Sequence, residues 1–276
     1  MYKRQDHAYE KNGAIWLESS KFGDDKDRVI IREDGRGTYL SADLAYHRNK
    51  LDRGFDTIIN VWGADHHGYI KRIEATIEAM GYSKKQMKVQ LVQFANLFEN
   101  GSKVKMSTRS GNFYTLKQLI DDIGPDASRF YYLSKQADQH LDFDIGIARS
   151  NSKDNLYYYI QYAHARISSV EKKFLELNQP LPKKFNDVDF DECDELLQMA
   201  LSAQFVIKSS GESLQPHLII YYLRDIAQNF HQFYNNVNIL NADEKHKNNI
   251  MRTLMIVKSV IASSLHLLGI EPLENM

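Results

Sequence analysis

The stretch Phe55-Asp-Thr-Ile-Ile-Asn-Val-Trp62 decides the fold of the first half, because this apolar run has the length and composition of a buried strand. A helical pattern follows it, with apolar residues three or four apart at Ile70, Ile73, Ile77 and Met80. Gly81 stands where a glycine commonly ends a helix, and Val89–Phe94 is a further strand candidate. The order strand, helix, strand predicts a parallel α/β sheet.

Shorter signals lie on both sides of this unit. Gly13–Leu17 and Arg28–Arg32 are apolar runs that predict strands. The Thr-x-x-Gln spacing of Thr115–Gln118 fits a capping box that opens a short helix ending near Gly124. A further helix is expected to start at Pro125.

From about residue 150 the strand signals stop, and three apolar stripes at helical spacing follow. The stripes are Leu156, Ile160, Ala163, Ile167, Val170 and Phe174, then Leu218, Tyr222, Ile226, Phe230 and Tyr234, then Ile250, Leu254, Val257, Ile261, Leu265 and Leu268. The charged, proline-bearing segment Asn178–Asp191 reads as a loop. This half therefore predicts an antiparallel helix bundle.

The composition limits the classes of protein to which the chain can belong. The 276 residues, 43% hydrophobic and 26% charged, predict a globular chain of about two domains. The net charge of −1 gives no overall attraction to nucleic acid, so RNA binding would depend on local basic groups. The single cysteine, Cys193, excludes an internal disulfide framework and fits a reducing compartment. No signal peptide is visible, and without an apolar run of about 18 residues no membrane span is expected.

The stretch Lys103–Asn112 carries three cations in seven positions, at Lys103, Lys105 and Arg109, with hydroxyls and glycines around them. Glycines let backbone N–H groups approach an anion, and lysines supply point charge, so the loop suits phosphate. A solvated surface turn explains the same residues, and spacing alone leaves both interpretations open.

Two further clusters lie nearby. Asp65, His66 and His67 follow the strongest strand, where ligands collect in parallel sheets. They could hold a metal, as in DHH-type phosphoesterases, although no clear set of further ligands lies at the ends of other strands. Otherwise one histidine caps the next helix.

Tyr39 and Asp43, four apart, would share a helical face and suit a guanidinium or ammonium ligand. An N-cap aspartate and a half-buried tyrosine are the alternative.

The segment Tyr157–Arg166 is dense in tyrosine. Such a helix usually belongs to a core, but tyrosines also stack on unpaired bases. Residue type alone leaves both possibilities open.

The order and spacing of these motifs carry more information than any one of them. The set is Gly23–Val29, Tyr39–His47, Arg53–Asp56, Val61–Gly68, Lys105–Arg109, Gly111–Asn112, Asp126–Phe130, Leu141–Asp144, Gln161–Arg166, Phe233–Asn235 and Leu267–Pro272. This set resembles the C-terminal half of bacterial arginyl-tRNA synthetases over nearly the whole chain.

The resemblance implies a class I synthetase that activates L-arginine with ATP, releases pyrophosphate and transfers the arginyl group to tRNA-Arg. It implies ATP as a substrate accompanied by Mg²⁺, no tightly bound cofactor, no metal site and no membrane. It also implies a cytoplasmic monomer. The fold implied is a partial Rossmann-like parallel sheet in residues 6–149, followed by an all-α anticodon-binding bundle in residues 150–276.

The resemblance also assigns roles to residues. The expected catalytic residues are Lys105, Ser107 and Arg109. The expected arginine-binding residues are Tyr39, Asp43 and His66. The expected ATP-binding residues are Gly63, Asp65, His67, Lys103, Lys105 and Met106. The expected tRNA-binding residues are Tyr162, His164, Arg166, Tyr234, Asn235 and Arg252.

Two departures from the family pattern bear on activity. The second lysine of the KMSKS motif is Thr108 here, and Arg109 or Lys103 could supply the missing cation. The His-x-Gly-His motif is absent from all 276 residues. We therefore expect this chain to be a fragment that is inactive alone. A noncatalytic tRNA-binding fragment or paralogue, or a DHH-type phosphoesterase, are the alternatives.

Overall fold

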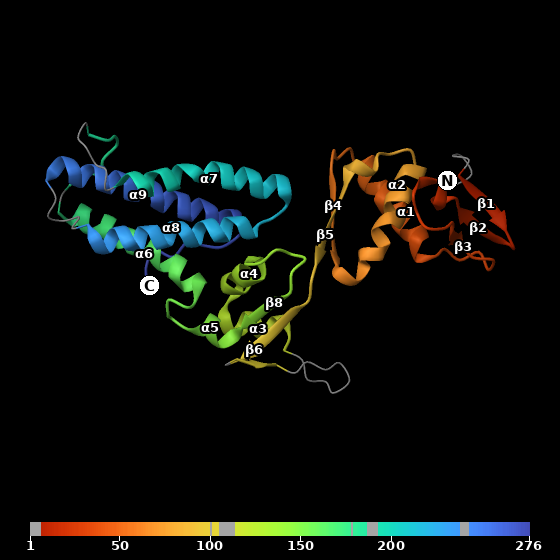
Figure 1. Ribbon diagram of the computed structural model, residues 1–276, viewed down its shortest axis with the longest axis horizontal. Helices are drawn as coiled ribbons and strands as arrows, with labels where there is room; N and C mark the ends of the chain where they lie inside the picture. The colour runs from red at the N-terminus through yellow and green to blue at the C-terminus, as the bar shows by residue number, and fades with distance from the viewer. Residues whose placement is uncertain (1–6, 100, 105–113, 178, 187–192, 238–242) are drawn as a thin grey trace. The chain divides into compact units, whose positions relative to one another are not determined.

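The computed structural model describes residues 7–99, 101–104, 114–177, 179–186, 193–237 and 243–276. They form two compact units, Met1–Phe94 and Ala95–Met276, each described by itself below (Figure 1). The domain boundary at residue 150 stays a prediction.

The first unit contains a three-stranded antiparallel sheet and a two-stranded parallel sheet. The antiparallel sheet consists of β1 (Ala8–Lys11), β2 (Ala14–Leu17) and β3 (Arg28–Ile31). The other elements are η2 (Ser19–Phe22), α1 (Tyr39–Asp52), β4 (Ile58–Gly63), η3 (Ala64–Tyr69), α2 (Ile70–Ala79), η4 (Lys84–Gln86) and β5 (Met87–Val92). The predicted strands therefore exist. Those at β2 and β3 pair antiparallel, whereas β4 and β5 pair in parallel.

The parallel pair has the predicted crossover. Strand β4 pairs with β5 from Ile58 opposite Met87 to Gly63 opposite Val92. Helix α2 connects them, and its Ile73 and Ile77 are fully buried against residues of α1, β4 and β5. Gly81 follows α2 with φ 85°, in the left-handed region where the missing Cβ removes a steric penalty.

The second unit combines a small mixed sheet with a helix bundle (Figure 1). The sheet has the order β7-β6-β8. Its strands are β6 (Ala95–Glu99), β7 (Ser102–Lys103) and β8 (Leu141–Asp144). The helices are α3 (Leu116–Ile123), α4 (Pro125–Leu133), α5 (Ile145–Arg149), α6 (Leu156–Glu176), α7 (Asp194–Ser213), α8 (His217–Asn236) and α9 (Glu244–Leu267). The predicted capping box of Thr115 and Gln118 opens α3.

The bundle core contains the three predicted stripes except Leu218, which is only half-buried, together with Phe130 of α4 and residues of α7, a helix that the periodicity did not reveal. Cys193 is fully buried within this core, where it packs as a small apolar side chain. By length and mean hydropathy alone, α9 could cross a bilayer. However, Leu254, Val257 and Ile261 are each 0% exposed within the bundle. This burial is typical of a core helix.

The segment after α9 is held by polar side chains of α4 and α6. The buried Gln161 donates from Nε2 to the carbonyl oxygen of Glu271 at 2.8 Å and accepts at Oε1 from the backbone N–H of Leu273 at 2.9 Å. The Asp126 carboxylate accepts from the N–H of Glu271, and Arg129 donates to the carbonyl of Gly269. We call residues 269–274 the tail.

We expect Gln161→Ala to lower the free energy of unfolding by roughly 1–3 kcal/mol, because it leaves the Glu271 carbonyl and the Leu273 N–H without their partner. Urea unfolding monitored by circular dichroism measures this change. Gln204→Ala is the matched control, since Gln204 is exposed and bonds only within its own helix. Equal destabilisation by both variants would contradict a special role for Gln161.

Candidate functional site

A cavity of about 590 Å³ lies where α1, β4 and η3 meet in the first unit. It is lined by Tyr39, Asp43, Tyr46, His47, Lys50, Asn60, Val61, Trp62, Gly63, His66 and Tyr69. The cavity therefore brings together all three residues predicted to bind arginine. It lies at the carboxyl end of a parallel strand, where ligands commonly bind in such sheets.

The start of α1 positions the first two of these residues. Thr38 is the N-cap: its side chain accepts from the N–H of Ser41, while its hydroxyl donates to the carbonyl of Val29 at 2.9 Å. The helix consequently begins at Tyr39, and Asp43 lies one turn later on the same face. The ring of Tyr39 is 88% exposed and free to contact a ligand.

Among the described residues that line the cavity, Asp43 is the only carboxylate. Its Oδ2 accepts a 2.6 Å hydrogen bond from the hydroxyl of Tyr69. Burial and this hydrogen bond raise the pKa of Tyr69, so the phenol remains a donor. The arrangement offers an anionic group between aromatic side chains, which suits a planar cation.

Behind Asp43 lies a chain of polar contacts. The His47 imidazole donates from Nδ1 to the carbonyl oxygen of Asp43 at 2.8 Å and accepts at Nε2 from the Asn60 amide at 2.9 Å. The Oδ1 of Asn60 accepts from the Lys50 ammonium at 2.7 Å. Because one imidazole nitrogen donates while the other accepts, His47 is neutral.

The residues from Gly63 to His67 differ in whether they line the cavity. His66 lines the cavity, and its Nε2 lies 3.7 Å from the Asp65 carboxylate. Asp65 and His67 are exposed outside the lining set. A Cβ on Gly63 would lie 2.5 Å from Oδ1 of Asp65, so this close approach requires glycine unless Asp65 moves.

A metal held by Asp65, His66 and His67 would need further ligands from nearby side chains. Within the part of the chain that the structure describes, no group of three His, Cys, Asp or Glu side chains could hold an ion. A DHH-type site needs such a group.

The loop Lys103–Asn112 lies largely outside the described residues. The predicted site residues that fall outside them are Lys105, Met106, Ser107 and Arg109, and the variant position Thr108 does so too. Lys103 is described: it is exposed at the end of β7.

Most of the predicted RNA-facing residues of the bundle cluster on α6 and α8. The Arg166 guanidinium lies 3.8 Å from the ring centroid of Tyr234 and 5.6 Å from that of Tyr162. Tyr162 stacks on His231, with centroids 5.6 Å apart. Tyr162 is 38% exposed, and stacked aromatic side chains beside a guanidinium can hold unpaired bases.

The other three predicted RNA contacts differ from one another. Asn235 is exposed on α8, and Arg252 is partly exposed on α9. His164 is only 1% exposed, and its Nδ1 donates to the carbonyl of Leu273 at 2.9 Å. The prediction that His164 faces RNA is therefore corrected: its imidazole is used inside the unit to hold the tail.

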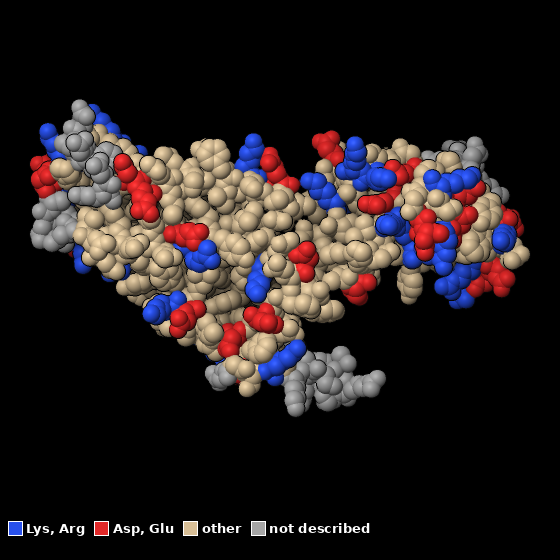
Figure 2. Space-filling view, in the orientation of Figure 1, with Lys and Arg blue, Asp and Glu red and all other residues tan. Residues whose placement is uncertain are grey.

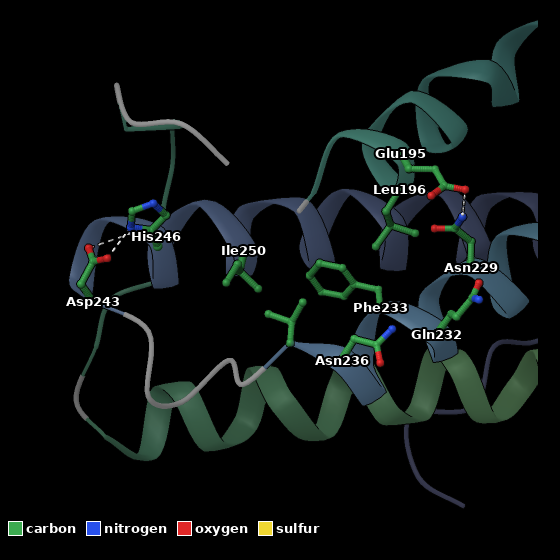
Figure 3. A pocket seen from close by; sticks show the side chains of 10 residues that line it. Glu195, Leu196, Asn229, Gln232, Phe233, Asn236, Asp243, His246 and Ile250 are labelled. Carbon is green, nitrogen blue, oxygen red and sulfur yellow. Dashed lines mark hydrogen bonds and ion pairs between the residues drawn. The ribbon is translucent and has the colours of Figure 1, made fainter. Parts of the chain in front are cut away.

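A second cavity, of about 750 Å³, lies between α7, α8 and α9 (Figure 3). Leu196, Phe233 and Ile250 form its apolar floor, and Asn229 donates to Glu195 at 2.8 Å on its rim. The Asp243 carboxylate adds further negative charge. Such a rim disfavours phosphate but can hydrogen-bond an uncharged polar group.

Charged side chains of both signs are interspersed on the face shown in Figure 2. This mixture agrees with the net charge of −1. Nucleic-acid binding would consequently depend on local groups such as Arg166 rather than on a broad basic surface.

Comparison with known proteins defines the class. Residues 1–142 match the model of the catalytic domain of class I tRNA synthetases (R), and residues 160–276 match the DALR anticodon binding domain. The arginine–tRNA ligase of Legionella pneumophila (strain Corby) is 42% identical over 279 residues, covering 99% of this chain and 48% of the relative. That of Vesicomyosocius okutanii is 44% identical over 275 residues, covering 98% and 47%.

Solved structures agree. The arginyl-tRNA synthetase structure from Campylobacter jejuni superposes with a TM-score of 0.90 at 39% identity, covering 100% of this chain and 60% of that one. The Thermus thermophilus enzyme, at 18% identity and a TM-score of 0.82 over 100% of this chain and 57% of its own, supports the fold alone. The chain belongs to the arginyl-tRNA synthetase family, and it spans about half the length of the curated relatives it matches. The predicted α/β-then-all-α architecture is confirmed.

Sequence reasoning gave no role to Tyr69, His47, Asn60 or Lys50. His47 lies four residues after Asp43, the spacing at which a side chain can bond back to a helical carbonyl, so helical spacing could have indicated it. The bond between Tyr69 and Asp43 spans 26 residues and depends on how η3 folds against α1.

Burial, reinforced by the Lys50 charge, lowers the pKa of His47 below its ordinary value of 6.5. Between that value and the lower folded-state pKa, the unfolded chain binds a proton that the folded chain does not. His47 therefore contributes stability above about pH 6.5 that is lost as the pH falls. We expect His47→Gln to flatten the pH dependence of the unfolding free energy between about pH 7.5 and 5.

Urea unfolding at several pH values measures this effect. The other histidines remain in both proteins, so the difference between variant and parent isolates His47. Identical slopes for the two proteins would contradict a neutral buried imidazole.

Proposed function

We propose that this chain acts in arginine–tRNA ligation, the ATP-dependent activation of L-arginine and its transfer to tRNA-Arg. The observation that carries the proposal is the convergence of Tyr39, Asp43 and His66 on one cavity. Because the chain spans about half of its relatives, the whole reaction and its substrates belong to this proposal. We also propose that the protein works as a cytoplasmic monomer.

The cavity would recognise the cationic end of arginine. Asp43 supplies the charge, and the exposed ring of Tyr39 and the imidazole of His66 supply flanking planar surfaces. Guanidinium groups bind carboxylates through two parallel N–H donors, and they stack on aromatic faces. Both features favour arginine over aliphatic amino acids.

The adenylation step needs position and charge rather than a nucleophilic side chain. The arginine carboxylate attacks the α-phosphate of ATP in line, and pyrophosphate leaves. We propose that Gly63, Asp65 and His67 lie near the adenosine, and that Lys103 and the loop with Lys105, Met106, Ser107 and Arg109 stabilise charge on the phosphates. Mg²⁺ accompanies ATP as part of the substrate.

The bundle would bind the tRNA. Tyr162, Arg166 and Tyr234 form a stacked group that can hold an unpaired base and its phosphate, with Asn235 and Arg252 as further contacts. Affinity would fall with salt, because binding a phosphate releases counterions.

We expect Asp43→Asn to weaken binding of L-arginine by about 10- to 100-fold, because the neutral amide cannot pair with a guanidinium. NMR titration of the 276-residue chain measures the dissociation constant. Asp52→Asn is the matched control, since Asp52 lies on the same helix but outside the cavity. If Asp43→Asn bound L-arginine as tightly as the parent chain does, the assignment of this cavity to arginine would be wrong.

We expect Tyr162→Ala to weaken binding of tRNA-Arg by about 5- to 100-fold at low salt, the effect of removing one stacking platform. Fluorescence anisotropy with labelled tRNA measures it. The matched control is Tyr221→Ala. Both tyrosines are 38% exposed, and Tyr221 has its own guanidinium, Arg224, at 5.5 Å. Equal losses in both variants, or binding that salt does not weaken, would contradict this RNA-binding face.

A further inference from the structure

Two groups from different elements hold Asp43. The Tyr69 hydroxyl at the end of η3 binds its carboxylate at Oδ2, and the His47 imidazole binds its backbone carbonyl. Asn60 on β4 in turn fixes His47. A carboxylate on a helix surface is free to rotate about two side-chain torsions, so a single hydrogen bond from a fixed donor removes most of that freedom.

Tyr69 is itself fixed. Its ring meets Trp62 edge-on, with centroids 6.1 Å apart, and the Arg72 guanidinium lies 4.8 Å from its centroid. Trp62 belongs to β4 and Arg72 to α2, so two elements set the position of the phenol. The donor hydroxyl is therefore held in place before any ligand arrives.

The charge of Asp43 is left available. Among the described residues, no Lys, Arg or His nitrogen forms an ion pair with it. A phenol is a neutral donor, so it orients the carboxylate without cancelling its charge, whereas an arginine or lysine in the same place would do both. No described residue donates a hydrogen bond to Oδ1, so Oδ1 and the remaining lone pair of Oδ2 can accept hydrogen bonds from a ligand.

We propose that Tyr69 is a positioning residue that fixes the Asp43 carboxylate for a planar guanidinium, and thereby sets the preference for a cationic over a neutral side chain. This inference rests on the proposed function of the cavity. Tyr69 acts through Asp43 and needs no contact with the substrate.

The test compares two ligands of nearly equal shape. L-Arginine carries a charged guanidinium, and L-citrulline carries a neutral urea group in its place. NMR titrations of the 276-residue chain and of Tyr69→Phe give both dissociation constants. We expect Tyr69→Phe to weaken arginine binding about 10-fold and to leave citrulline binding unchanged. Collapse of the cavity would instead weaken both ligands alike.

Tyr82→Phe is the matched control, since the Tyr82 hydroxyl donates to Asp52 on the same helix α1, away from the cavity. It should leave both affinities unchanged. Unaltered arginine affinity in Tyr69→Phe, or equal losses for arginine and citrulline, would overturn the inference while Asp43→Asn still reports on the proposed function. If the parent chain binds no arginine, the proposed function of the cavity fails, and the role of Tyr69 fails with it.

Discussion

Parallel pairing of β4 with β5 is the constraint on which the rest of the candidate site depends. Parallel strands need a crossover, and α2 provides it by burying Ile73 and Ile77 against the sheet. Because η3 lies between the carboxyl end of β4 and the crossover helix α2, Trp62 and Tyr69 both lie at the carboxyl edge of the sheet. This pairing therefore sets the β4 and η3 side of the cavity, and the Thr38 cap of α1 sets the opposite side.

Periodicity predicted the elements whose apolar residues repeat strictly. It gave β4, α2 and three bundle helices, because their buried positions are large side chains at fixed spacing. It missed α7, whose buried face includes the small residues Ala200 and Ala203 while Leu201 and Phe205 are exposed. Small residues bury little area, so they leave a weak signal in the sequence even where helices pack closely.

The candidate site was predictable where it depends on local geometry. Tyr39 and Asp43 share a face because a helix starts at a suitable cap. The role of Tyr69 was not predictable, because its bond to Asp43 requires a tertiary arrangement. His164 shows a different error: it stands four residues after the buried Ile160, so its position indicated the core although its residue type suggested RNA.

The tail has a consequence for folding kinetics. Gln161 bonds residues 110 and 112 positions away, and His164 one that is 109 away. Contacts of such separation form only after a long loop has closed, and that entropy must be lost before they contribute. The side chains of Gln161 and His164 on α6 would thus be among the last polar groups to form their native hydrogen bonds. A folding intermediate with an assembled bundle and an undocked tail is the species to look for.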